Sequence, residues 1–186
     1  CHPGKICAII LMIAFFRRRN ISVRRRCRRH TLILKYILDG MSFMVYNNIL
    51  EAVGHTPMVR LNHMVPEGCA EVLVKFEGLN VGGSIKTRTA LNMLEDAEKK
   101  NLISPSRTII VEPTSGNQGI GLALCGAVKG YKVKIIMPDS VSEERRLLVT
   151  HYGAEVILVH DAGNIGDCIE ECQRIADQMA AENPWD

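Results

Sequence analysis

Two apolar periodicities alternate along the chain from residue 47 onward. Short runs rich in β-branched residues predict strands at 58–61, 71–76, 108–111, 132–137 and 155–160. Apolar residues spaced three or four apart predict helices at 47–53, 86–100, 117–129, 142–151 and 165–181. Because strands and helices alternate through this part, we expect an α/β domain built on a parallel sheet.

Residues at the helix ends support these assignments. Gly130 and Gly153 directly follow two of the predicted helices, where a left-handed residue commonly ends a helix. At the other ends, Ser84 is expected to cap the helix that begins at residue 86, and Ser142 starts a capping-box-like turn that lacks the acid at its third position.

The segment Gly82–Ala90 places one lysine, Lys86, directly after a glycine pair and in the first turn of a predicted helix. A lysine gains nothing from the helix dipole there, because cations are favoured at the opposite end of a helix. An amine held in such a position can act as a nucleophile toward carbonyl groups. Taken alone, the segment is equally consistent with a reactive amine and with an ordinary lysine that is solvated in the first turn of a helix.

A second segment, Glu112–Gly121, links the strand 108–111 to the helix 117–129. Backbone N–H groups of a Gly/Ser/Thr/Asn turn between a strand and a helix form a cradle for anions. Two such loops can converge at the carboxyl ends of neighbouring strands, where open α/β sheets bind ligands. The segments 83–87 and 116–121 match the P-loop and the dinucleotide fingerprint only poorly, because their glycines are wrongly spaced.

The ordered motifs resemble one known family. Lys75–Lys86 followed by Pro113–Asn117 resembles the cysteine synthase / cystathionine β-synthase family, which are pyridoxal-phosphate (PLP) enzymes of the tryptophan-synthase-β fold type. The resemblance runs from about Tyr46 to Trp185 and includes the segments 54–61 and 142–146. The sequence departs from the family pattern at three positions, which hold Val81 for proline, Thr87 for aspartate and Gln118 for threonine.

The resemblance implies pyridoxal 5'-phosphate as cofactor and a role for each matching residue. Lys86 would hold the cofactor as a Schiff base and move the proton at the substrate α-carbon. Asn117 would bind the ring hydroxyl of the cofactor. The substrate α-carboxylate would be held by the residues Thr114, Ser115, Gly116, Asn117 and Gln118.

The implied reaction is β-replacement on a serine-derived amino acid, most simply O-acetylserine plus sulfide to give cysteine. O-phosphoserine or serine could replace the donor, and cystathionine β-synthase-like or diaminopropionate-synthase-like chemistry is an alternative. A catalytically inert truncated domain is another alternative. A regulatory module that kept the fold is less well supported, because Lys86 and Asn117 are both present.

The resemblance also implies a domain plan, that of a parallel-sheet, three-layer fold-type II enzyme truncated before most of the larger domain. Residues 41–79 would supply the first strands of that larger PLP-binding domain, and residues 80–186 the smaller α/β domain. The phosphate-binding loop and the partner of the pyridine nitrogen would lie beyond Asp186. We therefore expect this chain alone to bind PLP poorly and the full-length protein to be a homodimer.

The first 40 residues differ in charge from the rest. They hold ten Lys/Arg and one acidic residue, whereas residues 41–186 hold 13 basic and 19 acidic residues. The apolar run Ile6–Phe16 is too short to span a bilayer. Residues 1–40 could be an arm for membranes or nucleic acid, a processing segment, or translated sequence upstream of a start at Met41 or Met44. We favour the last, since the resemblance begins just after these methionines, and expect a poorly ordered segment without function.

The seven cysteines show no C-x-x-C spacing and no matching histidines, so we predict free thiols and no metal site. Cys168 and Cys172 share one helix face, where buried small apolar side chains are the better interpretation. The expected partners are therefore small molecules, an amino acid and sulfide or a thiol, in a cytoplasmic enzyme. We expect neither nucleic acid nor a membrane as a partner.

Overall fold

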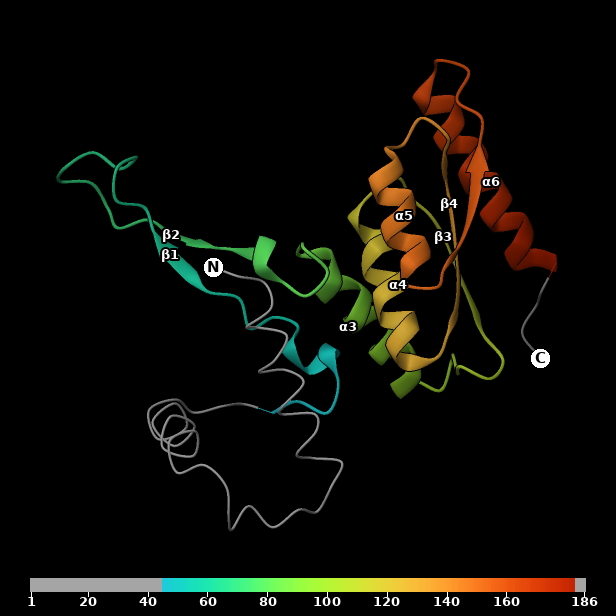
Figure 1. Cartoon of the computed structure of the whole chain (residues 1–186), viewed down its shortest axis with the longest axis horizontal. Helices are drawn as coiled ribbons and strands as arrows, with labels where there is room; N and C mark the ends of the chain where they lie inside the picture. The colour runs from blue at the N-terminus through green and yellow to red at the C-terminus, as the bar shows by residue number, and fades with distance from the viewer. Residues whose placement is uncertain (1–44, 183–186) are drawn as a thin grey trace, which may run out of the picture. The chain divides into compact units, whose positions relative to one another are not determined.

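The computed structural model describes residues 45–182, and two separate sheets lie within this part (Figure 1). The antiparallel pair consists of β1 (Met58–Arg60) and β2 (Leu73–Lys75). The parallel sheet has the strand order β3-β4-β5, formed by β3 (Ile109–Pro113), β4 (Lys132–Pro138) and β5 (Glu155–Val159). The predicted basic extension, residues 1–40, lies outside the described residues.

Four α-helices and two short 3₁₀ turns are present in the described part. The helices are α3 (Lys86–Lys99), α4 (Asn117–Lys129), α5 (Glu143–His151) and α6 (Ile165–Glu182). The segment predicted as a helix at 47–53 is instead the 3₁₀ turn η1 (Ile49–Ala52), and η2 (Glu77–Leu79) was not predicted. Each predicted strand is present, although β1 and β2 are shorter than expected.

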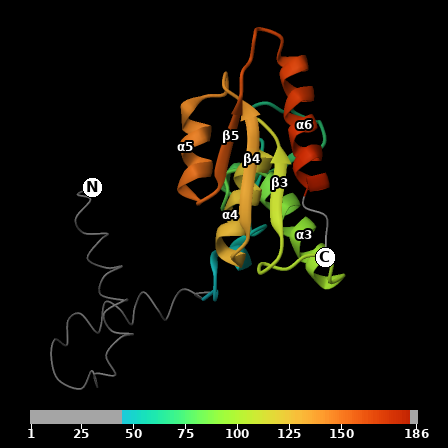
Figure 2. The ribbon, with the colours of Figure 1, turned by 90° about the vertical axis from the view of Figure 1, so that its right-hand side faces the viewer.

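The parallel sheet is the middle layer of three, as Figure 2 shows, with α4 and α5 on one face and α6 on the other. The central strand β4 is buried on both faces from Ile135 to Pro138, which explains the continuous apolar sequence of that part. Successive side chains alternate between the two cores: Ile135 and Met137 join the core under α4, and Ile136 joins the core under α6. The predicted three-layer α/β fold is confirmed.

Glycine allows α4 to lie very close to its neighbours. A Cβ atom on Gly126 would lie 2.3 Å from Val133 Cγ2 of β4, and one on Gly121 would lie 2.9 Å from the Lys86 carbonyl oxygen of α3. Side chains at these positions would push α4 away from β4 and from the first turn of α3. The close approach of α3 and α4 therefore requires glycine at residue 121.

The helix ends agree with the sequence in most but not all respects. Gly130 caps α4 in the left-handed conformation, with φ of 84°, and Gly153 adopts φ of 85° just after α5, both as predicted. Ser84 Oγ accepts the Lys86 N–H at 3.2 Å, which is the bond expected of a capping serine, although Ile85 occupies the position just before α3. Ser142 precedes α5 but makes no side-chain capping bond, so that part of the prediction is wrong.

The predicted domain boundary near residue 80 stays a prediction. The antiparallel pair lies before this residue and the parallel sheet after it. No helix within residues 45–182 combines the length and the apolar character needed to cross a membrane.

Replacing Gly121 by alanine should destabilise the fold by about 1–3 kcal/mol, because the new methyl group would meet the Lys86 carbonyl oxygen and the Ala90 side chain. Urea denaturation of the 186-residue chain measures the change. The matched control is Gly166→Ala in the first turn of α6, where a Cβ would meet only the Asn164 side chain. This control should be neutral or should stabilise by up to about 1 kcal/mol. Equal effects of the two substitutions would contradict the close approach.

Candidate active site

Lys86 is the first residue of α3, and its side chain is exposed. Its backbone N–H is satisfied by Ser84 Oγ. Its amine forms no hydrogen bond and no ion pair within residues 45–182. The amine is therefore accessible at the positive end of a helix, where electrostatics favours anions as neighbours.

The loop between β3 and α4 forms the second half of the site. Thr114 N–H bonds to the Ile136 carbonyl of β4 at 2.9 Å, which holds the start of the loop on the sheet. Thr114 Oγ1 then accepts the Gly116 N–H at 3.2 Å, and α4 begins at the next residue. The N–H groups of Ser115, Asn117 and Gln118 have no partner among the described residues. These N–H groups are available to an anion, and anion binding by this loop stays a prediction.

The packing of α3 on α4 brings the two loops together. Gly121, which touches the Lys86 carbonyl oxygen, lies four residues after Asn117 on α4. Because one helical turn contains 3.6 residues, the Lys86 backbone lies about one turn from the start of α4. The structure thus brings together the predicted lysine and the predicted anion-binding loop.

Glu112, on β3, is the acidic group that faces this region. Ile110 joins the core under α4 and Val111 joins the core under α6, so strand alternation places Glu112 on the α4 face. Burial raises the pKa of Glu112, and the positive charge of Lys86 offsets part of that rise. The sequence predicts no role for this glutamate, although it lies within the segment Glu112–Gly121.

Arg145, on α5, contacts the same loop from another direction. Its Nη1 donates a hydrogen bond to the Ser115 carbonyl oxygen at 3.1 Å. The sequence predicts no role for Arg145 beyond its place in the segment 142–146. The 30 residues between Arg145 and Ser115 explain why no local pattern could reveal their contact.

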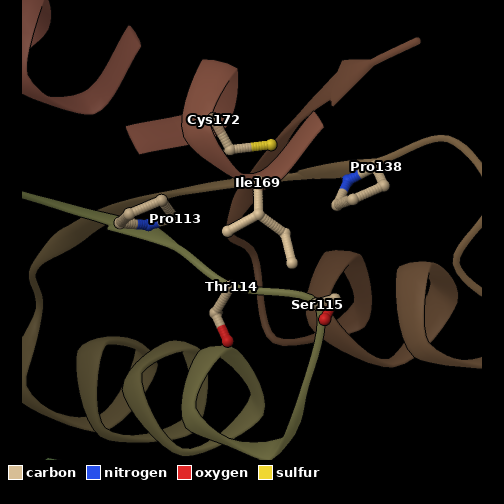
Figure 3. Close-up of a pocket in the computed structure, with 6 residues that line it drawn as sticks. All are labelled: Pro113, Thr114, Ser115, Pro138, Ile169 and Cys172. Atoms are coloured by element: carbon tan, nitrogen blue, oxygen red, sulfur yellow. The ribbon is translucent and has the colours of Figure 1, made fainter. Parts of the chain in front are cut away.

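The predicted substrate-binding residues do not all face the same space. The amide group of Gln118 lies against α3, with its Nε2 3.6 Å from Met93 Sδ, and its Oε1 is buried without a partner. Thr114 and Ser115 instead border a hollow of about 200 Å³ at the carboxyl ends of β3 and β4. Figure 3 shows Ile169 and Cys172 of α6 on the opposite side of this hollow.

The hollow lies on the α6 side of the loop, whereas the Thr114 side chain points toward α4, where a Cβ on Gly119 would lie 2.9 Å from its Cγ2 (Figure 3). The hollow is closed by α6, whereas Lys86 belongs to the helix that packs on α4. Burial raises the pKa of Cys172 to about 11, so its thiol stays protonated at neutral pH. Cys168 and Cys172 are free, buried thiols in the core under α6, as the sequence predicts.

Lys86→Ala should raise the pKa of Glu112 further, because it removes the cation that favours the ionised carboxylate. A carboxyl-carbon NMR titration of the 186-residue chain would measure this pKa. Lys132→Ala, which removes an exposed lysine at the start of β4, is the control and should leave the Glu112 titration unchanged. An unchanged pKa in Lys86→Ala would show that the two charges do not interact.

Comparison with known proteins places the chain in a family. Residues 49–185 match the family described as pyridoxal-phosphate dependent enzyme. A cysteine synthase from a Flavobacterium species is 46% identical over 142 residues, which cover 76% of this chain and 45% of that protein. A cysteine synthase from Staphylococcus aureus is 45% identical over 138 residues, covering 74% of this chain and 44% of that protein. The chain thus spans less than half the length of these relatives.

Two solved structures with similar sequences also have a similar fold. An O-ureido-L-serine synthase superposes with a TM-score of 0.68 at 43% identity, covering 76% of this chain and 43% of that chain. A hydrogen sulfide-producing enzyme from Fusobacterium nucleatum superposes with a TM-score of 0.63 at 44% identity, covering 73% of this chain and 44% of that chain. The chain therefore belongs to the pyridoxal-phosphate dependent enzymes.

Proposed function

We propose that this chain supplies the cofactor-binding lysine and the carboxylate-binding loop of an enzyme that catalyses β-replacement on a serine-derived amino acid. The single observation that supports it most is the free amine of Lys86 about one helical turn from the free N–H groups at the start of α4. The simplest reaction of this kind is O-acetylserine plus sulfide to give cysteine. Because the chain spans less than half the length of its relatives, the proposal is limited to the residues that this chain contributes to such an enzyme.

The described residues fit pyridoxal phosphate, which is the cofactor of the family. The cofactor needs an amine that can reach its carbonyl carbon, and the Lys86 amine is accessible and unpaired. The side chain of Asn117 is likewise exposed and has no partner in the described part, so it is available for the ring hydroxyl. When bound, the cofactor supplies an electron sink for bonds broken at the substrate α-carbon.

Lys86 has two roles in this proposal. Its Nζ would hold the cofactor, and the same amine would take the proton from the substrate α-carbon. A flexible, singly charged amine suits both roles, because it can act as nucleophile and as base. Glu112 on the same face balances the positive charge of this amine.

The loop after β3 orients the substrate. We assign the substrate α-carboxylate to the free N–H groups of Ser115, Asn117 and Gln118, together with the hydroxyls of Thr114 and Ser115. Donors already fixed in position hold an anion at little reorganisation cost. The Arg145 bond to the Ser115 carbonyl helps to keep the loop in place. The Gln118 side chain would have to leave Met93 to take part itself.

Substrate identity is the finest part of the proposal. The structural neighbour named O-ureido-L-serine synthase suggests that members of this fold act on different serine derivatives. Thr87, one of the departures from the family pattern, is fully buried, with its hydroxyl unpartnered against Gly82. Since members of this fold differ in substrate, donors and nucleophiles like those of cystathionine β-synthase or diaminopropionate synthase are alternatives within the same reaction class.

We further propose a cytoplasmic homodimer that binds neither nucleic acid nor membranes. The acidic balance of residues 41–186 supports the first exclusion, because nucleic-acid-binding surfaces are basic. Free thiols such as Cys125 and Cys172 stay reduced in the cytoplasm. The apolar residues Met58, Val59, Leu73 and Val74 are exposed on β1 and β2, and further protein would bury them.

Lys86 should be the residue that pyridoxal phosphate modifies. With excess cofactor, the 186-residue chain should develop a visible absorption band, and borohydride reduction should fix the label mainly on Lys86, as peptide mass spectrometry can show. Lys86→Ala should lose both signals and keep its far-UV circular dichroism. Lys99→Ala, in the last turn of the same helix, is the control and should keep both. An unchanged band in Lys86→Ala would overturn the assignment.

The loop after β3 should bind a simple carboxylate. Titration of the ¹⁵N-labelled chain with acetate should shift the amide signals of Ser115, Asn117 and Gln118, because these N–H groups are free. The start of α5 is an internal control, since its own Glu143 and Glu144 repel anions.

Gln118→Glu would place a negative charge beside the acetate, so the substitution should abolish these shifts. The matched control, Asn92→Asp on the exposed surface of α3, should preserve them. Equal shifts at the starts of α4 and α5 would show that the loop has no special affinity for carboxylates.

A further inference from the structure

Arg88, two residues after Lys86, fastens the first turn of α3 to two earlier segments of the chain. Its Nε and Nη2 donate to the two carboxylate oxygens of Glu77 in η2, each at 2.8 Å. Nη2 also donates to the Gly54 carbonyl oxygen at 2.6 Å. Such two-pronged arginine–carboxylate pairs are among the strongest hydrogen-bonded contacts between side chains.

Glu77 also holds residues other than Arg88. The Thr56 hydroxyl donates to its Oε1 at 2.6 Å, and Asn80 Nδ2 donates to its Oε2 at 3.1 Å. Asn80 Oδ1 in turn accepts the N–H groups of Gly54 and Val81, both at 3.1 Å. Each polar atom of the Asn80 side chain is thus paired, as a residue that is only 5% exposed requires.

The loop between Asn80 and Arg88 needs this support. It contains the glycine pair Gly82 and Gly83, the latter at φ of 74°, and glycine gives the unfolded loop many conformations. Inside the loop, the backbone N–H groups bond only to residues within the loop, such as Gly83 N–H to the Asn80 carbonyl at 2.7 Å, so these bonds do not tie the loop to another segment. Glu77 binds both ends of this loop, Asn80 at its start and Arg88 at its end.

The Glu77–Arg88 pair is partly protected from solvent, mainly on the Glu77 side. The Glu77 side chain is 16% exposed and that of Arg88 is 37% exposed. The hydrogen bonds from Arg88, and next that from Thr56, lower the pKa of Glu77 to about 2, so the carboxylate remains charged at any physiological pH. A Cβ on Gly54 would lie 2.6 Å from Arg88 Nη1, and its φ of 90° also favours glycine.

We propose that Glu77 and Arg88 are positioning residues for Lys86, and that they act by closing the loop 80–88 at both ends. Neither residue is expected to touch the cofactor. Their effect is to restrict the backbone that carries the Lys86 amine, so that this lysine reacts faster than the other exposed lysines of the chain. The proposal rests on the proposed function, because it assumes that Lys86 is the reactive amine.

The test compares Glu77→Gln and Arg88→Lys with the unmodified 186-residue chain. Both variants keep the size of the side chain and lose the two-pronged charged contact. Hydrogen exchange at the Gly83, Thr87 and Arg88 amides should become about tenfold faster. The ratio of borohydride-fixed pyridoxal phosphate on Lys86 to that on Lys99 should fall several-fold.

The matched control is Glu98→Gln, at the other end of α3. Glu98 forms a comparable half-buried pair with Lys129 at 2.7 Å and accepts the Tyr131 hydroxyl at 2.9 Å. This control should change neither the loop exchange nor the labelling ratio. Amide hydrogen exchange at Ile135 and Ile136 in the buried strand β4 reports global unfolding in every variant. A general loss of stability can therefore be subtracted from the change in exchange measured in the loop.

The possible outcomes separate the two proposals. If pyridoxal phosphate labels Lys86 of the unmodified chain no faster than Lys99, the proposed function is overturned. If Lys86 is labelled selectively, and Glu77→Gln and Arg88→Lys keep that selectivity and the slow loop exchange, the positioning role is refuted. An equal loss of selectivity in Glu98→Gln would also refute it, since the effect would then be a general one of α3 stability.

Discussion

The contact between α3 and α4 at Gly121 determines the arrangement of the candidate site. Only a glycine allows the second turn of α4 to lie against the Lys86 carbonyl oxygen, and Ala90 completes the contact one turn further along α3. This contact brings the starts of two helices, which come from loops about 30 residues apart, to within about one turn of each other. The accessible amine and the free backbone donors are near one another for that reason.

The loop before α3 and the loop after β3 are held by different kinds of contact. Side chains hold the loop before α3, where Glu77 binds both Asn80 and Arg88. The loop after β3 is held by the Thr114 N–H bond to the Ile136 carbonyl of β4, by the Gly116 N–H bond to Thr114 Oγ1 and by the Arg145 contact to the Ser115 carbonyl. A loop that leaves a parallel sheet can thus use the carbonyl of a neighbouring strand.

The electrostatics of the region favours an anionic ligand. Two helix N-termini and the Lys86 ammonium group contribute positive charge, and the charge of Lys86 partly offsets the rise in the pKa of the partly buried Glu112 that burial causes. A cofactor that carries a phosphate and a substrate that carries a carboxylate both suit this balance. The chain spans less than half the length of the cysteine synthases that it matches.

The sequence by itself determined the strands, the helices, the two glycine stops and the two loops, because these depend on contacts within a few residues. The motif resemblance likewise indicated Lys86 and Asn117. Tertiary structure alone decided which side chains meet across long separations, such as Arg88 with Gly54 and Arg145 with Ser115, since no local pattern encodes a partner 30 residues away. It also turned the Gln118 amide toward Met93 and left Ser142 without a capping bond, because packing against neighbouring elements overrides local preference.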